Sequence, residues 1–227
     1  MQRGSGVCTK SQPLRILIVD DHAIVRQGLA LLINKQEKLF VCAEAEDVES
    51  AQKSIDTHHP NLVILDISLK KASGLVLLEQ IKAQHEDLPV LIVSMHTESF
   101  YVTRALKAGA NGYFTKQERA ENLLLAIQTV LQGEIYLDKS LQNQMLNNFF
   151  GRKPNGNRPA LERLTSREFE ILQLLGQGYE TRKIALQLHI CIKTVEVHRA
   201  NIKEKLGLNT TAELLQYAFK LVASKSD

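Results

Sequence analysis

The sequence has few cysteines and no long apolar run, and both absences narrow the class of protein. Its three cysteines, Cys8, Cys42 and Cys191, are odd in number, far apart and without a paired C-x-x-C spacing. This pattern suggests neither a disulfide framework nor a zinc site, and it fits a reducing cytosol. No apolar stretch approaches the roughly 20 residues of a membrane span, and residues 1–13 lack the apolar core of a signal peptide. We therefore expect a cytoplasmic protein without membrane contact and a flexible segment over residues 1–13.

Charge is divided unevenly along the 227 residues. Residues 14–150 carry 13 Lys and Arg against 17 Asp and Glu, whereas residues 151–227 carry 13 against 8. The net charge is therefore −4 in the first part and +5 in the second. A basic segment beside an acidic one favours a polyanionic partner for the basic part, although a solvated charged surface explains the charge equally well. The length and the charge division together favour two domains.

The acidic part alternates short apolar runs with amphipathic stretches, an order that predicts parallel strands joined by crossover helices. The runs on strands one, three and four are uninterrupted, so these strands should be buried on both faces. We expect an α/β fold with a doubly wound, five-stranded parallel sheet, and ligand chemistry beyond the carboxyl ends of its strands. The runs cover 14–19, 39–43, 62–65, 90–93 and 112–114, and the amphipathic stretches lie near 22–35, 47–57, 74–84, 98–108 and 118–131.

The last third of the chain shows helical spacing throughout. Residues 151–160 concentrate Gly, Pro, Asn and basic residues, which neither helix nor strand favours, so we interpret them as a linker. The segment 140–150 is typical of a short helix that could belong to either domain. Residues 161–227 then predict four short helices. The expected divisions are therefore 1–13, 14–134, 135–160 for the connecting helix and linker, and 161–227 for the helical domain.

Three carboxylates are expected at one edge of the sheet. Asp20 and Asp21 end the first strand, and Asp66 ends the third, which should be its neighbour. Like charges this close repel unless a cation is present. Oxygen ligands with room for water suit Mg²⁺. An alternative is that the Asp pair caps the first helix, but this leaves Asp66 unexplained.

Two further groups fall at the ends of the neighbouring strands. Ser94 ends the fourth strand and Lys116 follows the fifth. Each is commonplace alone, and a single lysine after a strand is usually a solvated charge. Together with the carboxylates they supply a nucleophile, a metal site, a hydroxyl donor and a cation. Those are the groups needed to position and neutralise a transferring phosphoryl group.

Residues 14–131 resemble a response-regulator receiver domain, which has a flavodoxin-like fold, and the whole chain resembles the NarL/FixJ-type regulators. The resemblance implies that Asp66 accepts phosphate from a sensor histidine kinase. It also implies Mg²⁺ ligation by Asp20, Asp21, Asp66 and the backbone carbonyl of Ser68. Ser94 then matches the switch hydroxyl, Lys116 the phosphate-pairing lysine, and Tyr113 an aromatic that changes rotamer on activation. For Tyr113, ordinary packing on a sheet edge is the alternative.

The loop after Asp66 departs from the family pattern. It reads DISLKKASG, with Lys70 and Lys71 and no proline, although Gly74 keeps the expected spacing. Without the fixed φ of proline this loop should be freer. The departure leaves open a receiver that works without phosphate.

Residues 161–208 resemble the LuxR-type helix-turn-helix. Independently of that resemblance, Thr165 and Glu168 have the spacing of a capping box. A stripe of Ile171, Leu172, Leu174 and Leu175 should be buried, as should Ile184, Ala185 and Leu188 on the next helix. Val195, Ile202 and Leu206 should form the core face of a reading helix that starts near Ile192.

The outward face of that reading helix and the helix before it supply the candidate DNA-binding residues. Arg and Lys can bond guanine edges or phosphates, and Glu can accept from cytosine. The resemblance favours four groove-facing residues, Lys193, Thr194, Glu196 and Val197, and the remaining candidates are Arg182, Lys183, His198, Arg199 and Lys203. His198 has packing as an alternative, and Lys205 should continue the positive charge. Cys191 replaces the usual Ser cap, so the helix start should be less stable.

These observations predict a two-component response regulator, not an enzyme beyond its own phosphoryl transfer and dephosphorylation. Its partners would be DNA and a sensor histidine kinase, with a homodimer when phosphorylated. The last helix, 211–222, covers the core or forms a dimer contact. The acidic domain should dock on the basic one and cover its reading helix. Two alternatives are a Mg²⁺-dependent aspartyl phosphatase, which lacks its second acid at Ser68, and an adaptor that has lost DNA affinity.

Overall fold

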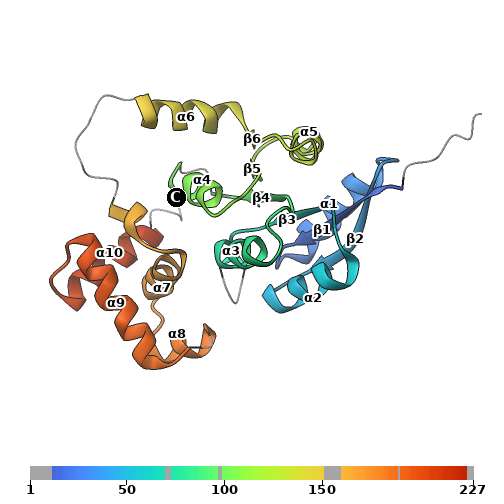
Figure 1. The fold of residues 1–227 in the computed structure, drawn as a ribbon. Coiled ribbons are helices and arrows are strands. Elements are labelled where there is room, and N and C mark those ends of the chain that lie inside the picture. Colours follow the sequence, from blue (N-terminus) through green and yellow to red (C-terminus); the bar gives the residue numbers. More distant parts are fainter. Residues whose placement is uncertain (1–11, 70–72, 97–98, 151–159, 189, 224–227) are drawn as a thin grey trace, which may run out of the picture.

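The computed structural model describes residues 12–69, 73–96, 99–150, 160–188 and 190–223. An α/β part holds a central sheet, and an all-helical part follows it in the chain and lies against one side of it (Figure 1). The expected flexible segment over residues 1–13 falls almost wholly outside the described residues.

The sheet has six strands among the described residues, not the five expected, and all of them are parallel. Their order is β2-β1-β3-β4-β5-β6. The additional strand is two residues long and pairs with β5, where Gly112 meets Tyr136 and Tyr113 meets Leu137. Its brevity explains why apolar alternation gave no signal for it. The strands are β1 Leu14–Val19, β2 Leu39–Ala45, β3 Leu62–Leu65, β4 Val90–Ser94, β5 Gly112–Thr115 and β6 Tyr136–Leu137.

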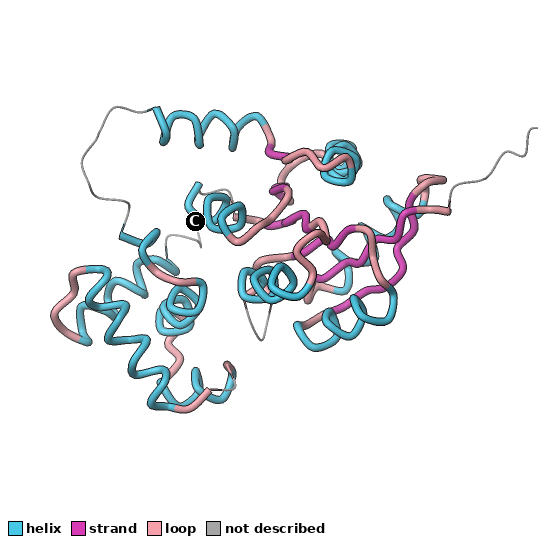
Figure 2. Tube along the Cα trace, in the orientation of Figure 1, coloured by secondary structure: helices cyan, strands magenta, loops and turns pink. Residues whose placement is uncertain are grey.

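Helices cover both faces of this sheet (Figure 2). Strands β3 and β4 are buried along their whole length, as their continuous apolar runs predicted, whereas β1 is buried only after its first two residues, Leu14 and Arg15, which are exposed. Alternate residues of the strands pack into two separate cores, one under α1 and α5 and the other under α2, α3 and α4. The helices are α1 Ala23–Asn34, α2 Val48–His58, α3 Gly74–Gln84, α4 Ser99–Lys107 and α5 Ala120–Leu131.

Helix α6, Lys139–Phe150, is the short helix whose domain the sequence did not settle. Its first turn is held by Asp138, whose carboxylate accepts a hydrogen bond of 2.8 Å from the backbone of Leu141. Leu141 is buried in the core under α4, so α6 packs on the α/β part. The linker that we expect at 151–160 lies outside the described residues except for Ala160.

The helical part consists of a 3₁₀ turn and the four helices that were expected. The capping box is confirmed, because Thr165 accepts from the backbone of Glu168 while Glu168 accepts from that of Thr165. The predicted core stripes are buried, except that Leu206 is half-buried. The elements are η1 Ala160–Arg163, α7 Ser166–Gly176, α8 Thr181–Gln187, α9 Ile192–Leu206 and α10 Thr211–Ala223.

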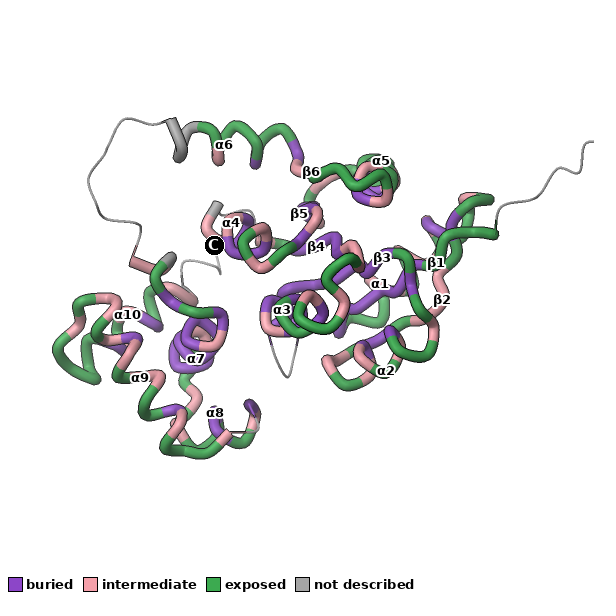
Figure 3. Tube along the Cα trace, viewed as in Figure 1, coloured by how far each residue is buried: buried purple, intermediate pink, exposed green. Residues whose placement is uncertain are grey.

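Helix α7 is buried on nearly all sides (Figure 3). It packs on α9 and α10 with one side and on α3 with another. As a result, the core under α3 and α4 runs without interruption into the core of the helical part. A helix that is apolar or buried all round must be covered by more than one neighbour. Here α7 is the element that joins the two parts.

Candidate functional site

The three carboxylates predicted at the sheet edge do converge. Asp20, Asp21 and Asp66 are only 2%, 8% and 3% exposed. Strand β1 pairs directly with β3, which brings the two strand ends together. The alternative that the Asp pair caps the first helix is wrong, because the N-cap is His22 and its side chain makes no capping bond. Capping of α1 therefore does not explain why these carboxylates lie at the end of the strands.

Lys116 lies between two of these carboxylates. Its Nζ donates to Asp20 Oδ2 at 2.7 Å and to Asp66 Oδ2 at 2.8 Å. Burial works to lower the pKa of Lys116, but the hydrogen bonds and charges of the two aspartates outweigh it and raise the pKa above its usual value. The lysine therefore stays protonated, and the solvated-charge interpretation is wrong for it.

Asp66 offers one oxygen to this lysine and the other to its own loop. Its Oδ1 accepts from the backbone N–H of Ser68 at 3.2 Å. Burial raises the pKa of Asp66, and the hydrogen bond from Lys116 offsets part of that rise. Positive charges near Asp66 would favour its ionised carboxylate, which is the form that acts as a nucleophile.

The same edge of the sheet suits a divalent cation. Asp20, Asp21, Asp66 and the ring of His22 each offer a ligand atom, and these atoms all lie within 4.8 Å of one another. His22 also lies 2.8 Å from Asp21, a contact that the sequence did not suggest. Buried carboxylates at this spacing, with only part of their charge balanced by Lys116, fit an oxygen-ligated ion such as Mg²⁺.

Ser94 is fully buried at the end of β4, as expected. Its hydroxyl accepts from the backbone N–H of His96 at 3.2 Å, and the ring of His96 lies 3.1 Å from the hydroxyl of Ser68. Tyr113 is buried and donates to the carbonyl of His96 at 2.8 Å. Because β6 covers β5, packing on a sheet edge does not describe Tyr113. His96 was missed, although its place two residues after Ser94 could have indicated it.

The predicted reading helix α9 presents its amino end to solvent. Lys193, Glu196 and Val197 are exposed, with Thr194 half-buried beside them. On α8, both Arg182 and Lys183 are exposed, and Lys183 lies over the ring of Tyr179. Cys191 is the N-cap without a capping bond from its side chain, as the replacement of serine suggested.

Two basic residues of α9, Arg199 and Lys205, have contacts within the helical part. Arg199 donates to the hydroxyl of Thr181 at 2.6 Å, which ties α9 to α8. Lys205 was expected to extend the positive surface, but its Nζ lies 2.6 Å from Glu168 and forms a partly buried ion pair. His198 is half-buried with a buried Nδ1, in line with the packing alternative. Lys203 remains half-buried on the helix.

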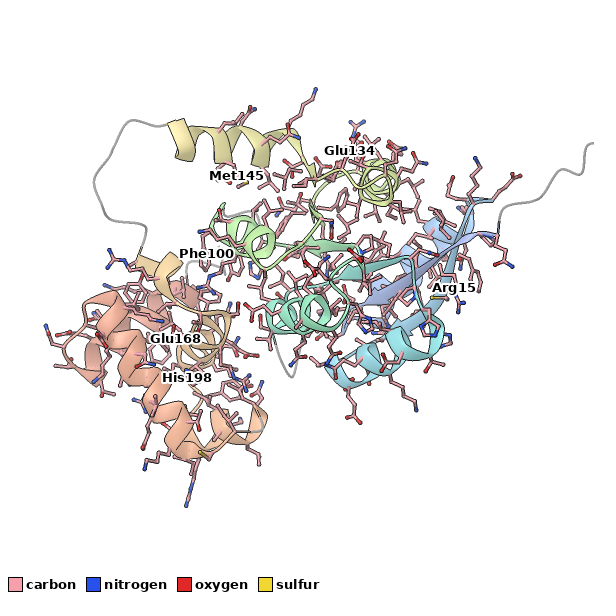
Figure 4. All side chains as sticks on the ribbon, in the orientation of Figure 1. Arg15, Phe100, Glu134, Met145, Glu168 and His198 are labelled. Atoms are coloured by element: carbon pink, nitrogen blue, oxygen red, sulfur yellow. The ribbon has the colours of Figure 1, made fainter. Side chains whose placement is uncertain are left out.

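The two parts dock on each other, as expected. The docked surface, however, is not the reading helix α9 that we expected the acidic part to cover. The contacts come from η1 and α7, which meet α3 and α4. Phe100 of α4 lies on the side that faces the helical part, 4.8 Å from the ring of Phe169, while His198 of α9 lies beyond α7 (Figure 4). The expectation that the acidic part covers the reading helix is therefore wrong, because ring and helix packing around α7, rather than net charge, sets the docking face.

Two family models match the chain, and they divide it as the fold does. Residues 16–128 match "Response regulator receiver domain", and residues 162–218 match "Bacterial regulatory proteins, luxR family". The chain is also 37% identical to the oxygen regulatory protein NreC of Staphylococcus epidermidis, over 91% of this chain and 97% of the relative. The chain is a response regulator. It belongs to the family that joins a receiver to a LuxR-type DNA-binding domain.

Other relatives agree with this family. NreC of Staphylococcus carnosus is 35% identical over the same shares of both chains, 91% and 97%. A LuxR-family response regulator of Aurantimonas superposes with a TM-score of 0.59 at 30% identity, covering 61% of this chain and 99% of that one. RcsB of Salmonella enterica, solved on promoter P1flhDC with phosphomimetic BeF₃⁻, shares the fold with a TM-score of 0.67 at 24% identity, over 91% and 98% of the chains.

Family membership confirms several expectations. Response regulators are transcription regulators rather than classical enzymes, which sets aside the phosphatase alternative. Their partners are a sensor histidine kinase and DNA. In the described part of the chain, no helix is both long and apolar enough to cross a bilayer.

Proposed function

We propose that Asp66 of this response regulator accepts a phosphoryl group from a sensor histidine kinase, and that this modification controls sequence-specific DNA binding by α9. The observation that carries the proposal is the buried Asp66 carboxylate, held 2.8 Å from Lys116 and beside Asp20 and Asp21. We further propose a receiver over 14–134, a connecting helix and linker over 135–160 and a helix-turn-helix domain over 161–227, acting in the cytoplasm.

In the transfer, a carboxylate oxygen of Asp66 forms a bond to phosphorus as the P–N bond of the donor phosphohistidine breaks. The bonding electrons stay with the histidine nitrogen of the kinase. Lys116 pairs with the phosphoryl oxygens and neutralises their charge. Asp20, Asp21, Asp66 and the backbone carbonyl of Ser68 would hold Mg²⁺, which supplies further neutralisation of that charge when bound.

Ser94 and Tyr113 would change conformation when Asp66 is phosphorylated and so transmit the phosphorylation to the rest of the receiver. The Ser94 hydroxyl can turn from the His96 backbone toward a phosphoryl oxygen, because its present acceptor role leaves its own proton available for donation. Tyr113 is bonded to the carbonyl of the same His96, so a shift there alters both residues. Such a shift needs a difference in contacts between the two states.

For DNA, the exposed amino end of α9 is the reading surface, with Lys193, Thr194, Glu196 and Val197 toward the bases. Further residues flank this surface and would lie toward the phosphate backbone of the DNA: Arg182, Lys183, Arg199, Lys203 and His198. A homodimer of the phosphorylated form would present two such helices, so that the second half-site is bound intramolecularly.

The direct test is labelling of the full chain. We expect acetyl phosphate with Mg²⁺ to add one phosphoryl group, read as a single mass increase on the intact protein that is stable in acid and labile in base. Asp66→Asn should abolish it, while Asp56→Asn on the exposed face of α2 should leave it unchanged. Equal labelling of Asp66→Asn and the parent would refute the assignment.

A further inference from the structure

The imidazole of His22 lies beside the carboxylates of the pocket but has no part in the proposed transfer. Its Nδ1 lies 2.8 Å from Asp21 Oδ1 and 3.3 Å from Asp20 Oδ1. The His22 side chain is 60% exposed, whereas these two carboxylates are buried. Although His22 is the N-cap of α1, its side chain makes no capping bond. The ring therefore lies where the pocket meets the solvent, and starting the helix does not explain its place.

The turn that carries this ring is held by hydrogen bonds on both sides. The backbone N–H of His22 donates to Asp20 Oδ1 at 2.8 Å. Arg26 of α1 donates to the backbone carbonyl of Asp20 at 2.6 Å, and its Nε donates to Glu44 at 3.3 Å. These bonds fix the end of β1 against the first turn of α1. A side chain on such a fixed backbone is suited to be a metal ligand, because little of the site has to be ordered when the ion binds.

The distances between the donor atoms match those around a single ion. Two ligands at right angles, each about 2.1 Å from a metal, lie about 3 Å apart, and opposite ligands lie about 4.2 Å apart. The Nδ1 of His22 is 2.8 and 3.3 Å from the two aspartate oxygens. Donor atoms of Asp20, Asp21, His22 and Asp66 all lie within 4.8 Å of one another. A small movement of the exposed His22 ring is therefore enough to bring its nitrogen onto the same ion as the carboxylates.

An imidazole nitrogen changes which ion the pocket favours. Mg²⁺ prefers oxygen ligands and keeps several of its waters, so it gains little from a ring nitrogen. Divalent transition ions such as Fe²⁺, Co²⁺ and Zn²⁺ bind imidazole well, and they also accept carboxylate oxygens. A pocket with three carboxylates and one imidazole thus offers the mixed nitrogen and oxygen ligands that these ions bind.

We propose that His22 is a ligand of the metal site beside Asp66 and that it makes this site selective for a divalent transition ion over Mg²⁺. The inference rests on the proposed function of Asp66, which requires a cation there. The His22 ring supplies a nitrogen to the ion, while Asp20, Asp21 and Asp66 supply oxygens. Because the ring is exposed, an ion reaches it from solvent without any opening of the fold.

Titration of the unphosphorylated full chain with Co²⁺, and separately with Mg²⁺, followed by calorimetry and amide NMR shifts, tests this assignment. Co²⁺ generally binds such sites more tightly than Mg²⁺, so the informative quantity is the ratio of the two dissociation constants. His22→Ala should weaken Co²⁺ binding at least about tenfold, since residues that only support a metal ligand are already worth about 10–100-fold. Its Mg²⁺ affinity should stay within about twofold of the parent. His85→Ala is the matched control, because His85 also lies near an aspartate, 3.7 Å from Asp56, but at the amino ends of the strands.

A second measurement distinguishes coordination by the ring from a hydrogen bond. A histidine bound to Co²⁺ gives ring-proton NMR signals far downfield of the other protein signals. The parent and His85→Ala should show these signals, and His22→Ala should lack them. His22→Gln keeps an amide N–H that can donate to Asp21 but has no imidazole nitrogen, so its Co²⁺ affinity should be as low as that of His22→Ala.

The possible outcomes separate the interpretations. Co²⁺ affinity in His22→Ala equal to that of the parent overturns the assignment. Parental affinity in His22→Gln also overturns it, because the ring would then act only as a hydrogen-bond donor. Asp20→Asn should weaken binding of both ions, and unchanged Co²⁺ binding in this variant would place the ion outside the pocket and contradict the proposal. None of these titrations needs phosphate, so if the ions bind as expected but the parent takes no phosphoryl group at Asp66, the proposed function fails while ligation by His22 stands.

Discussion

Gly74→Ala should damage the phosphoacceptor site although it adds a single methyl group. The new Cβ would lie 2.0 Å from the carbonyl oxygen of Asp66, whereas ordinary contact begins at 3.4 Å. The main chains of Gly74 and Asp66 must therefore separate by about 1.4 Å, the difference between these two distances. The hydrogen bond of 2.8 Å from Gly74 to Ile67 cannot survive that separation.

The expected loss of stability has two contributions, the overpacking at Gly74 and the lost hydrogen bond to Ile67. Overpacking costs about 1–3 kcal/mol, and the lost backbone hydrogen bond adds about 1 kcal/mol. A total of about 2–4 kcal/mol lowers the melting temperature by roughly 4–16 °C in a protein of this size. The displaced Asp66 should also accept phosphate more slowly, because a misplacement of about 1 Å weakens catalysis severely.

The assay is a thermal melt followed by labelling with acetyl phosphate at a temperature where every variant is folded. Gly28→Ala is the matched control, since nothing lies within 4 Å of its Cβ position inside α1. That substitution should raise stability by about 0.5–1 kcal/mol and leave labelling unchanged. If Gly74→Ala melts with the parent and labels at the same rate, the close approach to Asp66 is not a constraint.

Three other substitutions test separate parts of the account. Lys116→Ala should still label with Mg²⁺ in excess but show weaker phosphate-induced dimerisation in sedimentation, and an equal response would show that Lys116 does not stabilise the phosphorylated state. Glu168→Gln should destabilise the DNA-binding domain by about 1–3 kcal/mol at neutral pH, because it leaves the Lys205 ammonium without its carboxylate, whereas exposed Glu204→Gln should not. Burial works to raise the pKa of Glu168, but hydrogen bonds from Lys205 and Thr165 lower this pKa below that of an ordinary glutamate, so the stabilisation is present above the ordinary value. It is lost as the pH falls through the lower folded pKa, and denaturant melts of parent and variant should converge there; a constant difference would contradict the ion pair. Arg182→Ala should weaken DNA binding and reduce the salt slope of log K by about 1, and an unchanged slope would remove Arg182 from the phosphate contacts.

Much of the fold follows from sequence patterns that are local. Continuous apolar runs gave the buried strands, and the spacing of Thr165 and Glu168 gave the start of α7. The carboxylate pocket was predictable as well, because parallel strands necessarily bring the residues after them to one edge. Strand β6 was not, since two residues are too short for any periodicity to appear.

The contacts between the domains could not be predicted. Arg104 and Glu170 look like solvent-facing charges in a helical pattern, but both are buried, Arg104 against η1 and the ring of Phe169 and Glu170 against the backbone of Ser73. Lys205 shows the same limit, because its partner Glu168 is 37 residues away in the sequence. Net charge suggested that the domains meet, but it carries no information about which helix forms the contact. That choice depends on the ring of Phe169 and its neighbours, which act through tertiary packing.

The measurement that bears most directly on the central claim is a mobility-shift titration on one selected palindrome, with parent and Asp66→Asn, each with and without acetyl phosphate. We expect phosphorylation to tighten binding by the parent at least about tenfold, through an effective concentration of the second reading helix. Asp66→Asn should bind like the unphosphorylated parent under both conditions. Identical curves for phosphorylated and unphosphorylated parent, with the phosphoryl group verified by mass, would contradict control of DNA binding by Asp66.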